Sequence, residues 1–306
     1  MHYDVIVIGG SYAGMAAALQ LVRARKSVLV IDTGERRNRF ASTSHGFLGQ
    51  DGVDPGVIAA QARRQLVAYP TLAWLEGRAE AIAGQADRFT VTMADGASMQ
   101  GRRILLALGV ADQLPAIAGL AERWGKSVFH CPYCHGYELD EGRIGVIATG
   151  PMSSHQAQLL TEWGTVTLLV NHAVTLGPDI RADLARRGVA IEDAPIDRIE
   201  GDAEVRLDDG RLLTFAGLFT AARCIPSAPL AEAAGCALEE TPMGVQVRID
   251  AENKTSVPGI YACGDVALVP HSLSFAVGSG AMAGIQIHRS LCWPETVHHA
   301  QIVAAA

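Results

Sequence analysis

The chain has 306 residues, of which 49% are hydrophobic, and its 25 basic and 32 acidic side chains give a net charge of −7. This composition excludes an intrinsically disordered protein and argues against nucleic acid as a partner, while the length predicts about two domains of roughly 150 residues. The longest apolar run, about residues 104–111, is too short to cross a membrane, and no basic segment typical of a signal peptide precedes the first strand. We therefore expect a cytoplasmic protein whose six cysteines do not form a disulfide framework.

The first predicted unit is strand, glycine turn, helix and strand. Residues 5–8 form an apolar run, residues 9–14 form the turn, and a second apolar run at residues 28–31 ends at Asp32. Short, wholly apolar strands are typical of a parallel sheet that is covered on both faces. Alternating segments between residues 73 and 108 predict a β-meander that returns to this sheet.

A second unit of the same kind begins at Arg143. Its predicted elements are a strand at 144–148, a turn at 149–151, a helix at 153–163, a strand at 166–170 and a closing strand at 212–220. From Thr255 the chain returns to a strand at 259–262 and a helix at 274–291. The order predicts an α/β fold with two nested Rossmann-like dinucleotide-binding domains. The FAD-type domain is discontinuous, over 1–112 and 243–306, and the NAD(P)H-like domain is inserted at 113–242.

The glycine turn reads Gly9-x-Ser11-x-x-Gly14, with serine at the second glycine position of a dinucleotide fingerprint. Such a turn lets the backbone approach a pyrophosphate, and the helix that follows directs its N-terminal amides at the same group. Asp32 stands 18 residues beyond Gly14, where a carboxylate can accept hydrogen bonds from an adenosine ribose. On this segment alone, a unit without a nucleotide remains an alternative.

Residues 255–265, which read Thr-Ser-Val-Pro-Gly-Ile-Tyr-Ala-Cys-Gly-Asp, resemble the second FAD motif of flavoproteins with two dinucleotide domains. In those proteins the closing aspartate binds the ribityl chain of FAD. The resemblance therefore implies FAD as cofactor, with Asp265 as its ribityl ligand.

Two cysteines three residues apart, Cys131 and Cys134, lie in the most specific stretch of the chain, residues 129–138. At the start of a helical turn they are close enough to form a small-ring disulfide, and the helix N-terminus lowers the pKa of a thiolate there. A zinc site is the alternative, because His130 and His135 could supply two further ligands, but no second Cys-x-x-Cys is present. The remaining cysteines are expected to be buried small hydrophobic residues: Cys224, Cys236, Cys263 and Cys292.

Together, these motifs resemble the low-molecular-weight thioredoxin reductase family over residues 3–291. The resemblance implies a redox-active disulfide in the inserted domain, with Cys134 next to the flavin and Cys131 exchanging with substrate. We predict no metal, and we predict as FAD-contacting residues Gly9, Ser11, Tyr12, Ala13, Gly14, Asp32, Asn38, Arg39, His45, Ala79, Gly109, Gly264, Asp265, Phe275 and Ala276.

Departures from this family concern NADPH and the acid–base group. Ala148 stands where NADPH-binding members begin a glycine turn, and Pro151 removes a backbone donor. Residues 170–176 lack the arginines that hold the 2′-phosphate, which makes NADPH doubtful unless His172 or Arg181 substitutes. Histidines flank the cysteines, with His135 in place of the family's aspartate, and we expect them to titrate near neutral pH and move protons.

In these departures the chain resembles the dithiol oxidases of the gliotoxin and holomycin pathways. Those enzymes also have a histidine after the Gly-Asp motif, and His271 is the matching residue here. The resemblance implies oxidation of a small dithiol or a thioredoxin-like protein, with electrons passing through the cysteines and FAD to oxygen and release of peroxide, in a homodimer. An NAD(P)H- or ferredoxin-dependent disulfide reductase remains an alternative. So does a redox sensor that binds FAD without turnover.

Overall fold

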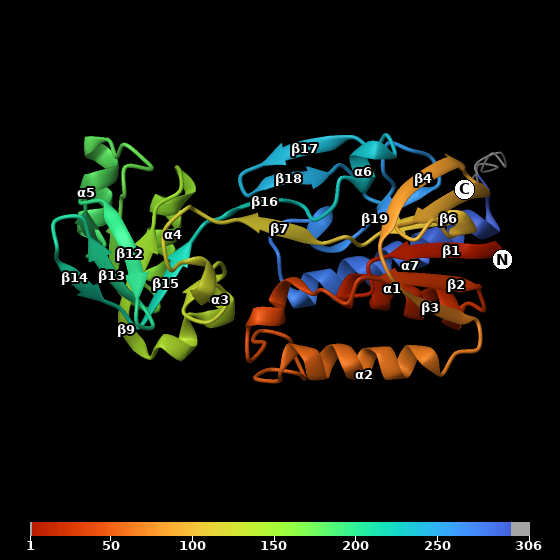
Figure 1. Cartoon of the computed structure of the whole chain (residues 1–306), viewed down its shortest axis with the longest axis horizontal. Helices are drawn as coiled ribbons and strands as arrows, with labels where there is room; N and C mark the ends of the chain where they lie inside the picture. The colour runs from red at the N-terminus through yellow and green to blue at the C-terminus, as the bar shows by residue number, and fades with distance from the viewer. Residues whose placement is uncertain (1, 295–306) are drawn as a thin grey trace, which may run out of the picture.

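The computed structural model describes residues 2–294 as two units, which a pair of extended strands connects (Figure 1). The connecting strands are β7 (Val110–Gln113) and β16 (Arg223–Pro226), which pair antiparallel. The outer unit contains both ends of the described chain, and the inserted unit lies between the two connecting strands in sequence. No helix among residues 2–294 has the length and apolar character needed to cross a membrane.

The outer unit is built on a parallel sheet. Its parallel strands are β3 (Leu72–Glu76), β2 (Val28–Asp32), β1 (His2–Ile8), β6 (Ser98–Leu106) and β19 (Ile260–Ala262), in this spatial order. The second half of β6 pairs with β19, whereas its first half pairs antiparallel with β5 (Arg88–Met93), which in turn pairs with β4 (Ala79–Gln85). This arrangement confirms the predicted strands and meander.

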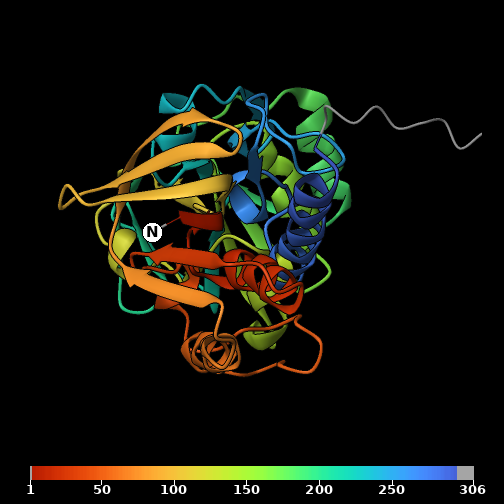
Figure 2. The same cartoon turned by 90° about the vertical axis from the view of Figure 1, so that its right-hand side faces the viewer.

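Two helices from opposite ends of the chain, α1 (Tyr12–Arg23) and α7 (Leu273–Cys292), pack side by side against this sheet (Figure 2). Glycine permits their close approach, because a Cβ on Gly280 would stand 2.1 Å from the Ala13 carbonyl oxygen. Helix α2 (Pro55–Val67) packs beside α1. The contact between α1 and α7 brings the two predicted FAD motifs to one end of the sheet.

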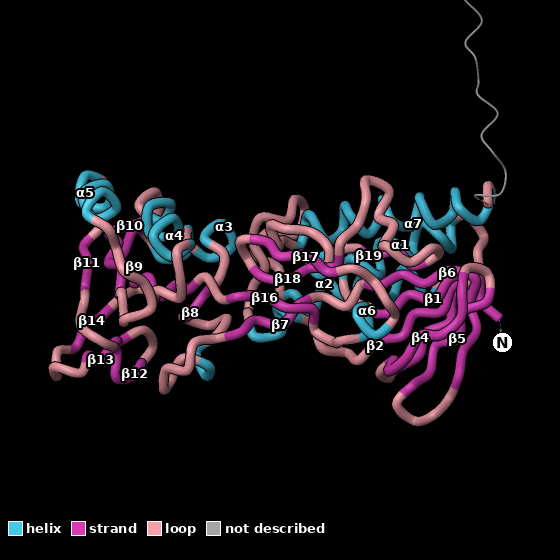
Figure 3. Tube along the Cα trace, turned by 90° about the horizontal axis from the view of Figure 1, so that it is seen from above, coloured by secondary structure: helices cyan, strands magenta, loops and turns pink. Residues whose placement is uncertain are grey.

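The inserted unit has a parallel sheet of its own (Figure 3). Its strands are β11 (Ala190–Glu192), β10 (Gly164–Leu169), β9 (Glu141–Ile147), β15 (Gly217–Thr220) and β8 (Val128–Phe129), with helices α3 (Pro132–His135), α4 (Met152–Leu160) and α5 (Pro178–Arg186). A separate antiparallel sheet contains β12 (Ile196–Glu200), β13 (Glu204–Leu207) and β14 (Leu212–Thr214). The single strand predicted at 212–220 is therefore wrong, because β14 and β15 lie in different sheets.

The segment 223–242, which the sequence assigns to the inserted unit, packs with the outer unit. It contains β16, α6 (Leu230–Ala233) and β17 (Leu238–Thr241), and β17 pairs with β18 (Gly244–Val247) in a sheet that also includes β7. Leu230, Ala231 and Cys236 are buried in the apolar core of the outer unit. Burial of these side chains stabilises the packing of the segment against that unit.

Candidate active site

The cysteine pair stands at the beginning of α3. Cys131 is the N-cap of this short helix, and both Cys131 and Cys134 are partly buried free thiols. A hydrogen bond from the Cys134 thiol, together with the backbone N–H groups of Tyr133 and Cys134, lowers the pKa of Cys131, while the same hydrogen bond and burial raise the pKa of Cys134. Cys131 is therefore the thiolate of the reduced pair.

The two histidines that flank this pair lie in different surroundings. Burial and the nearby positive charge of Arg37 lower the pKa of His130 to about 4. Burial and His45 lower the pKa of His135 to about 4 as well, and the His135 ring stacks on Phe129 with 4.4 Å between ring centroids. The expectation that both titrate near neutral pH is wrong, because desolvation penalises the charged imidazole. Both rings are neutral at pH 7 and can accept a proton.

Arg37, which was not among the predicted site residues, pairs with two carboxylates near the cysteine pair. Arg37, at the start of η1 (Arg37–Phe40), donates from Nη1 to Asp265 Oδ2 at 3.0 Å and from Nε to Asp112 Oδ2 at 3.0 Å. Burial alone would raise the pKa of Asp112, but the two-pronged contact with Arg37 holds it below the usual value. The charges of Arg37 and Asp265 also reach Cys134, so the cysteine pair faces this ion-pair cluster. The sequence signal for Arg37 was its position next to the selected Asn38.

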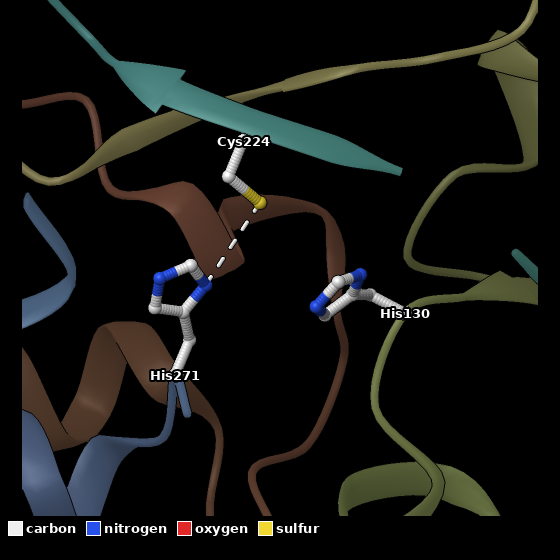
Figure 4. A group of neighbouring side chains, drawn as sticks. All are labelled: His130, Cys224 and His271. Carbon is white, nitrogen blue, oxygen red and sulfur yellow. Dashed lines mark hydrogen bonds between the residues drawn. The ribbon is translucent and has the colours of Figure 1, made fainter. Parts of the chain in front are cut away.

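A second cluster brings residues of both units together (Figure 4). His271 is buried, and its Nδ1 stands 3.9 Å from Cys224 Sγ, while its ring lies 6.3 Å from that of His130 between centroids. Cys224 is buried as expected, and burial raises its pKa to about 12. Its sulfur also lies 3.4 Å from Arg37 Nη2, which places Cys224 in the site although the sequence gave no signal beyond its apolar neighbours.

The other cysteines differ in their burial. Cys236 and Cys263 are buried, as expected, but the prediction for Cys292 is wrong, because it is exposed near the end of α7. Within residues 2–294, the side chains that come together with ligand spacing are His130, Cys224 and His271. The four residues of the zinc alternative, Cys131, Cys134, His130 and His135, do not form such a group there.

The glycine turn of the outer unit has the shape of a pyrophosphate cradle. Gly9 has φ +110°, and a Cβ there would lie 2.1 Å from the Ala107 carbonyl oxygen, while a Cβ on Gly14 would lie 1.8 Å from the carbonyl oxygen of Gly9. Ser11 is the N-cap of α1 but makes no side-chain cap, so the N–H groups at Tyr12, Ala13 and Gly14 remain available to a phosphate.

The carboxylate of Asp32 stands beside this turn. Its Oδ1 accepts a hydrogen bond from the backbone N–H of Gly10 at 3.0 Å, at the C-terminal end of β2. In a dinucleotide-binding turn, a carboxylate at the end of the second strand is the group that holds the ribose. The turn, the helix end and this carboxylate together fit an adenine dinucleotide.

Several of the predicted FAD-contacting residues line the loop after β2. Asn38 donates to the Tyr12 hydroxyl at 3.2 Å, and its buried Oδ1 has no hydrogen-bond partner. Arg36 Nε and Ser44 Oγ, which the sequence analysis did not select, are likewise buried without a partner. A bound ligand would supply the missing partners, since buried polar groups without them are costly. Arg39 is exposed, with its guanidinium 4.3 Å from the centre of the Phe40 ring.

The remaining predicted contacts lie in two loops and in three elements, β4, η4 and α7. His45 Nδ1 lies 3.4 Å from Glu138 Oε1, a contact between the outer unit and the segment after α3. Gly109 has φ +70° with open space at its Cβ position. Ala79 is buried in β4, and Gly264 begins η4 (Gly264–Val266), which also contains Asp265. Phe275 is exposed and Ala276 is half-buried in the first turn of α7.

In the corresponding turn of the inserted unit, a serine side chain occupies the backbone amides. Ser153, which is buried, accepts hydrogen bonds at its hydroxyl from the backbone N–H groups of Thr149, at 2.9 Å, and Gly150, at 3.4 Å. Ala148 is buried directly before them. The amides that would hold a pyrophosphate in this turn are therefore already satisfied.

The loop after β10 also lacks an available cation. Asn171 and His172 have left-handed backbones, and Asn171 Oδ1 accepts a hydrogen bond from the backbone N–H of Ile196 at 2.8 Å. Arg181 makes a two-pronged contact with Asp193, at 3.1 Å from Nη1. Arg181, one of the two side chains considered for a 2′-phosphate, is therefore already paired with a carboxylate. The other, His172, is exposed.

Comparison with known proteins gives consistent matches over nearly the whole chain. The family model described as pyridine nucleotide-disulphide oxidoreductase matches residues 3–301. Thioredoxin reductase tcpT of Claviceps purpurea (strain 20.1) is 33% identical over 298 residues, which cover 92% of each chain. The crystal structure of an oxidoreductase from Agrobacterium tumefaciens is 54% identical, with a TM-score of 0.94 over 96% of this chain and 100% of that one. The crystal structure of HlmI is 33% identical, with a TM-score of 0.88 over 95% and 93%.

Proposed function

Because the chain belongs to the pyridine nucleotide-disulphide oxidoreductase family, we propose that it is a dithiol oxidase, which uses Cys131 and Cys134 to take two electrons from a dithiol and delivers them through FAD to oxygen. At the coarser level it is a thioredoxin reductase-like flavoprotein that acts on sulfur groups and uses FAD. The direction of electron flow and the acceptor are the proposed part.

The observation that carries this proposal is the closed turn at Thr149, Gly150 and Ser153. A reductase of this family that uses NADPH needs a turn with open amides and cationic side chains for the 2′-phosphate. Here Ser153 satisfies the amides, residues 170–176 contain no arginine, and Arg181 is engaged with Asp193. These features favour a dithiol over a nicotinamide nucleotide as the source of electrons.

The chemistry begins with the pair as a disulfide. A substrate thiolate attacks Cys131 Sγ, the Cys131–Cys134 bond breaks, and Cys134 leaves as a thiolate whose charge the nearby Arg37 stabilises. The second substrate thiol then attacks the sulfur bonded to Cys131, so the substrate leaves as a disulfide and Cys131 leaves as a thiolate, the favoured anion of the pair.

Protons and electrons are accounted for in this scheme. The two thiol protons pass to neutral imidazoles next to the pair, for which His130 and His135 are the candidates, and from there to solvent. When bound, FAD supplies the two-electron step that returns the cysteines to the disulfide and reduces one oxygen molecule, with two protons, to hydrogen peroxide. The net reaction converts a dithiol and oxygen into a disulfide and peroxide.

The surface beside Cys131 favours a small apolar dithiol as substrate. Tyr133 is 70% exposed and Tyr137 is 85% exposed, and the Tyr133 ring stands edge-on to Trp163 with 5.3 Å between centroids. Exposed aromatic rings at a reaction centre provide contact area for an apolar molecule. A thioredoxin-like protein is the second candidate, because it also presents apolar surface around its cysteines.

The spectrum of the bound flavin tests the proposal. Under anaerobic conditions, we expect a stoichiometric dithiol to bleach the flavin within one turnover time, and NADPH, NADH and reduced ferredoxin to leave it oxidised. On admission of air, one peroxide should form for each disulfide produced. Bleaching by a nucleotide or ferredoxin but not by a dithiol would identify a reductase, and absence of both bleaching and peroxide would identify a redox sensor. A Cys236→Ser variant serves as a control, since Cys236 lies in the core of the outer unit.

Assembly and location complete the proposal. Phe275, Met282 and Ile285 are exposed along one face of α7, and this apolar face supports a homodimer formed through the outer unit. Light scattering should give twice the mass of the chain, and Met282→Glu should give a monomer. The free thiols of the chain are compatible with the cytoplasm.

A further inference from the structure

We propose that His130, Cys224 and His271 form a binding site for a transition metal ion of the Zn²⁺ type. Their ligand atoms all lie within 4.8 Å of one another, and the three side chains point toward a common space (Figure 4). Two imidazoles and one thiolate are a donor set that Zn²⁺ binds readily.

The spacing requires little rearrangement. A tetrahedral zinc ion with bonds of about 2.0 Å to nitrogen and about 2.3 Å to sulfur holds its ligand atoms about 3.3–3.5 Å apart. Cys224 Sγ and His271 Nδ1 are already 3.9 Å apart, and His130 Nδ1 is a buried nitrogen without a hydrogen-bond partner. The ligand atoms therefore need to approach by at most about 1.5 Å, which rotation of the side chains can supply. A fourth position remains for water or substrate.

The charges around the cluster are compatible with a divalent cation. Arg37 lies 3.4 Å from Cys224 Sγ, but it makes ion pairs with the carboxylates of Asp112 and Asp265. The three charged groups sum to −1, and the thiolate of Cys224 adds another negative charge when the ion displaces the thiol proton to solvent. A Zn²⁺ ion then brings the cluster to neutrality.

The three ligands come from different parts of the fold, so a bound ion would affect how the two units are held together. His130 belongs to the inserted unit next to the cysteine pair, His271 belongs to the outer unit after Asp265, and Cys224 lies on the connecting strand β16. One ion bound by all three holds the cysteine-bearing unit to the FAD unit. It also occupies the imidazole of His130, so bound Zn²⁺ is expected to inhibit turnover. The inhibition rests on the proposed function, whereas the binding does not.

Metal binding can be measured without turnover. The FAD-loaded protein is first oxidised so that Cys131 and Cys134 form a disulfide and are not available as ligands. Titration with Co²⁺ should then give one ion per chain, with a thiolate-to-cobalt charge-transfer band, and X-ray absorption of the Zn²⁺-loaded protein should show one sulfur and two imidazole nitrogens. Absence of the thiolate band, or a zinc shell without sulfur, would overturn the proposal without the use of any variant.

Variants then assign the ligands. Cys224→Ser and Cys224→Ala should each abolish the thiolate band and weaken Zn²⁺ binding by at least about 10–100-fold. Loss of a residue that only hydrogen-bonds to a metal ligand already weakens binding by this much. Cys236→Ser, a buried cysteine elsewhere in the outer unit, should bind Zn²⁺ like the unmodified chain. Unchanged affinity in both Cys224 variants would refute the site. If Zn²⁺ binds as expected but does not slow dithiol oxidation, the inhibitory role alone is wrong.

Discussion

The hydroxyl of Ser153 accepts the backbone N–H of Thr149 at 2.9 Å, inside the turn where a second dinucleotide would place its pyrophosphate. Because this hydroxyl is buried and also accepts the N–H of Gly150, it satisfies two backbone donors of the turn that precedes α4. We expect Ser153→Ala to lower the free energy of unfolding by about 1 kcal/mol, the usual net contribution of an intramolecular hydrogen bond. Urea denaturation measures this change. Ser154→Ala is the matched control, and an equal loss in both variants would contradict the role of the Ser153 hydroxyl in this turn.

The ion pairs of Arg37 with Asp112 and Asp265 predict a larger effect. Its side chain is 22% exposed, so removal of the guanidinium leaves two carboxylates without their cation at the junction of the units. We expect Arg37→Gln to lower the free energy of unfolding by on the order of 3 kcal/mol. Arg223→Gln, which breaks an exposed pair with Glu240, should change it by less than about 1 kcal/mol.

The same arginine can be tested through its neighbour His130. Because the positive charge of Arg37 contributes to the low pKa of His130, Arg37→Gln should raise that pKa from about 4 toward its usual value. An NMR titration of the imidazole measures the change. An unaltered pKa in a folded variant would show that burial alone is responsible.

The two neutral histidines beside the cysteines predict a dependence of stability on pH. Their pKa is about 4 in the folded chain and 6.5 without perturbation, so between these values the unfolded chain binds more protons. The free energy of unfolding therefore falls as the pH decreases from about 6.5 to about 4, by on the order of 2–3 kcal/mol for each histidine. Denaturation curves across this range should show the slope, and His135→Phe should reduce it. His155→Phe, at an exposed position, should leave the slope unchanged.

The hydrogen bond between the two thiols predicts which one reacts. In the reduced protein, iodoacetamide at neutral pH should label Cys131 before Cys134, because the Cys134 thiol lowers the pKa of Cys131. Cys134→Ala removes the donor and should raise the pH midpoint of Cys131 alkylation, whereas Cys134→Ser retains a donor and should shift it less. Mass spectrometry of the labelled peptide gives the rates. Faster labelling of Cys134 would reverse the assignment.

Much of the architecture was predictable because it depends on local patterns. The apolar runs before and after the turn at Gly9 are confirmed as β1 and β2 in a parallel sheet. The domain boundary near residue 242 was predicted incorrectly, because residues 223–242 join the outer unit through burial of Leu230, Ala231 and Cys236. No local pattern reports which of two cores an apolar side chain enters, since that choice depends on distant partners.

The sequence by itself determined the dinucleotide turn, the Gly-Asp motif and the paired cysteines, because each requires particular residue types at short, fixed spacings. Only the tertiary structure decided what surrounds them. It placed Arg37 between Asp112 and Asp265, brought Cys224 next to His271, and lowered the pKa of His130 and His135. These contacts join residues separated by up to 228 positions. Electrostatics and desolvation depend on distance in space, so they appear only once the two units are folded against each other.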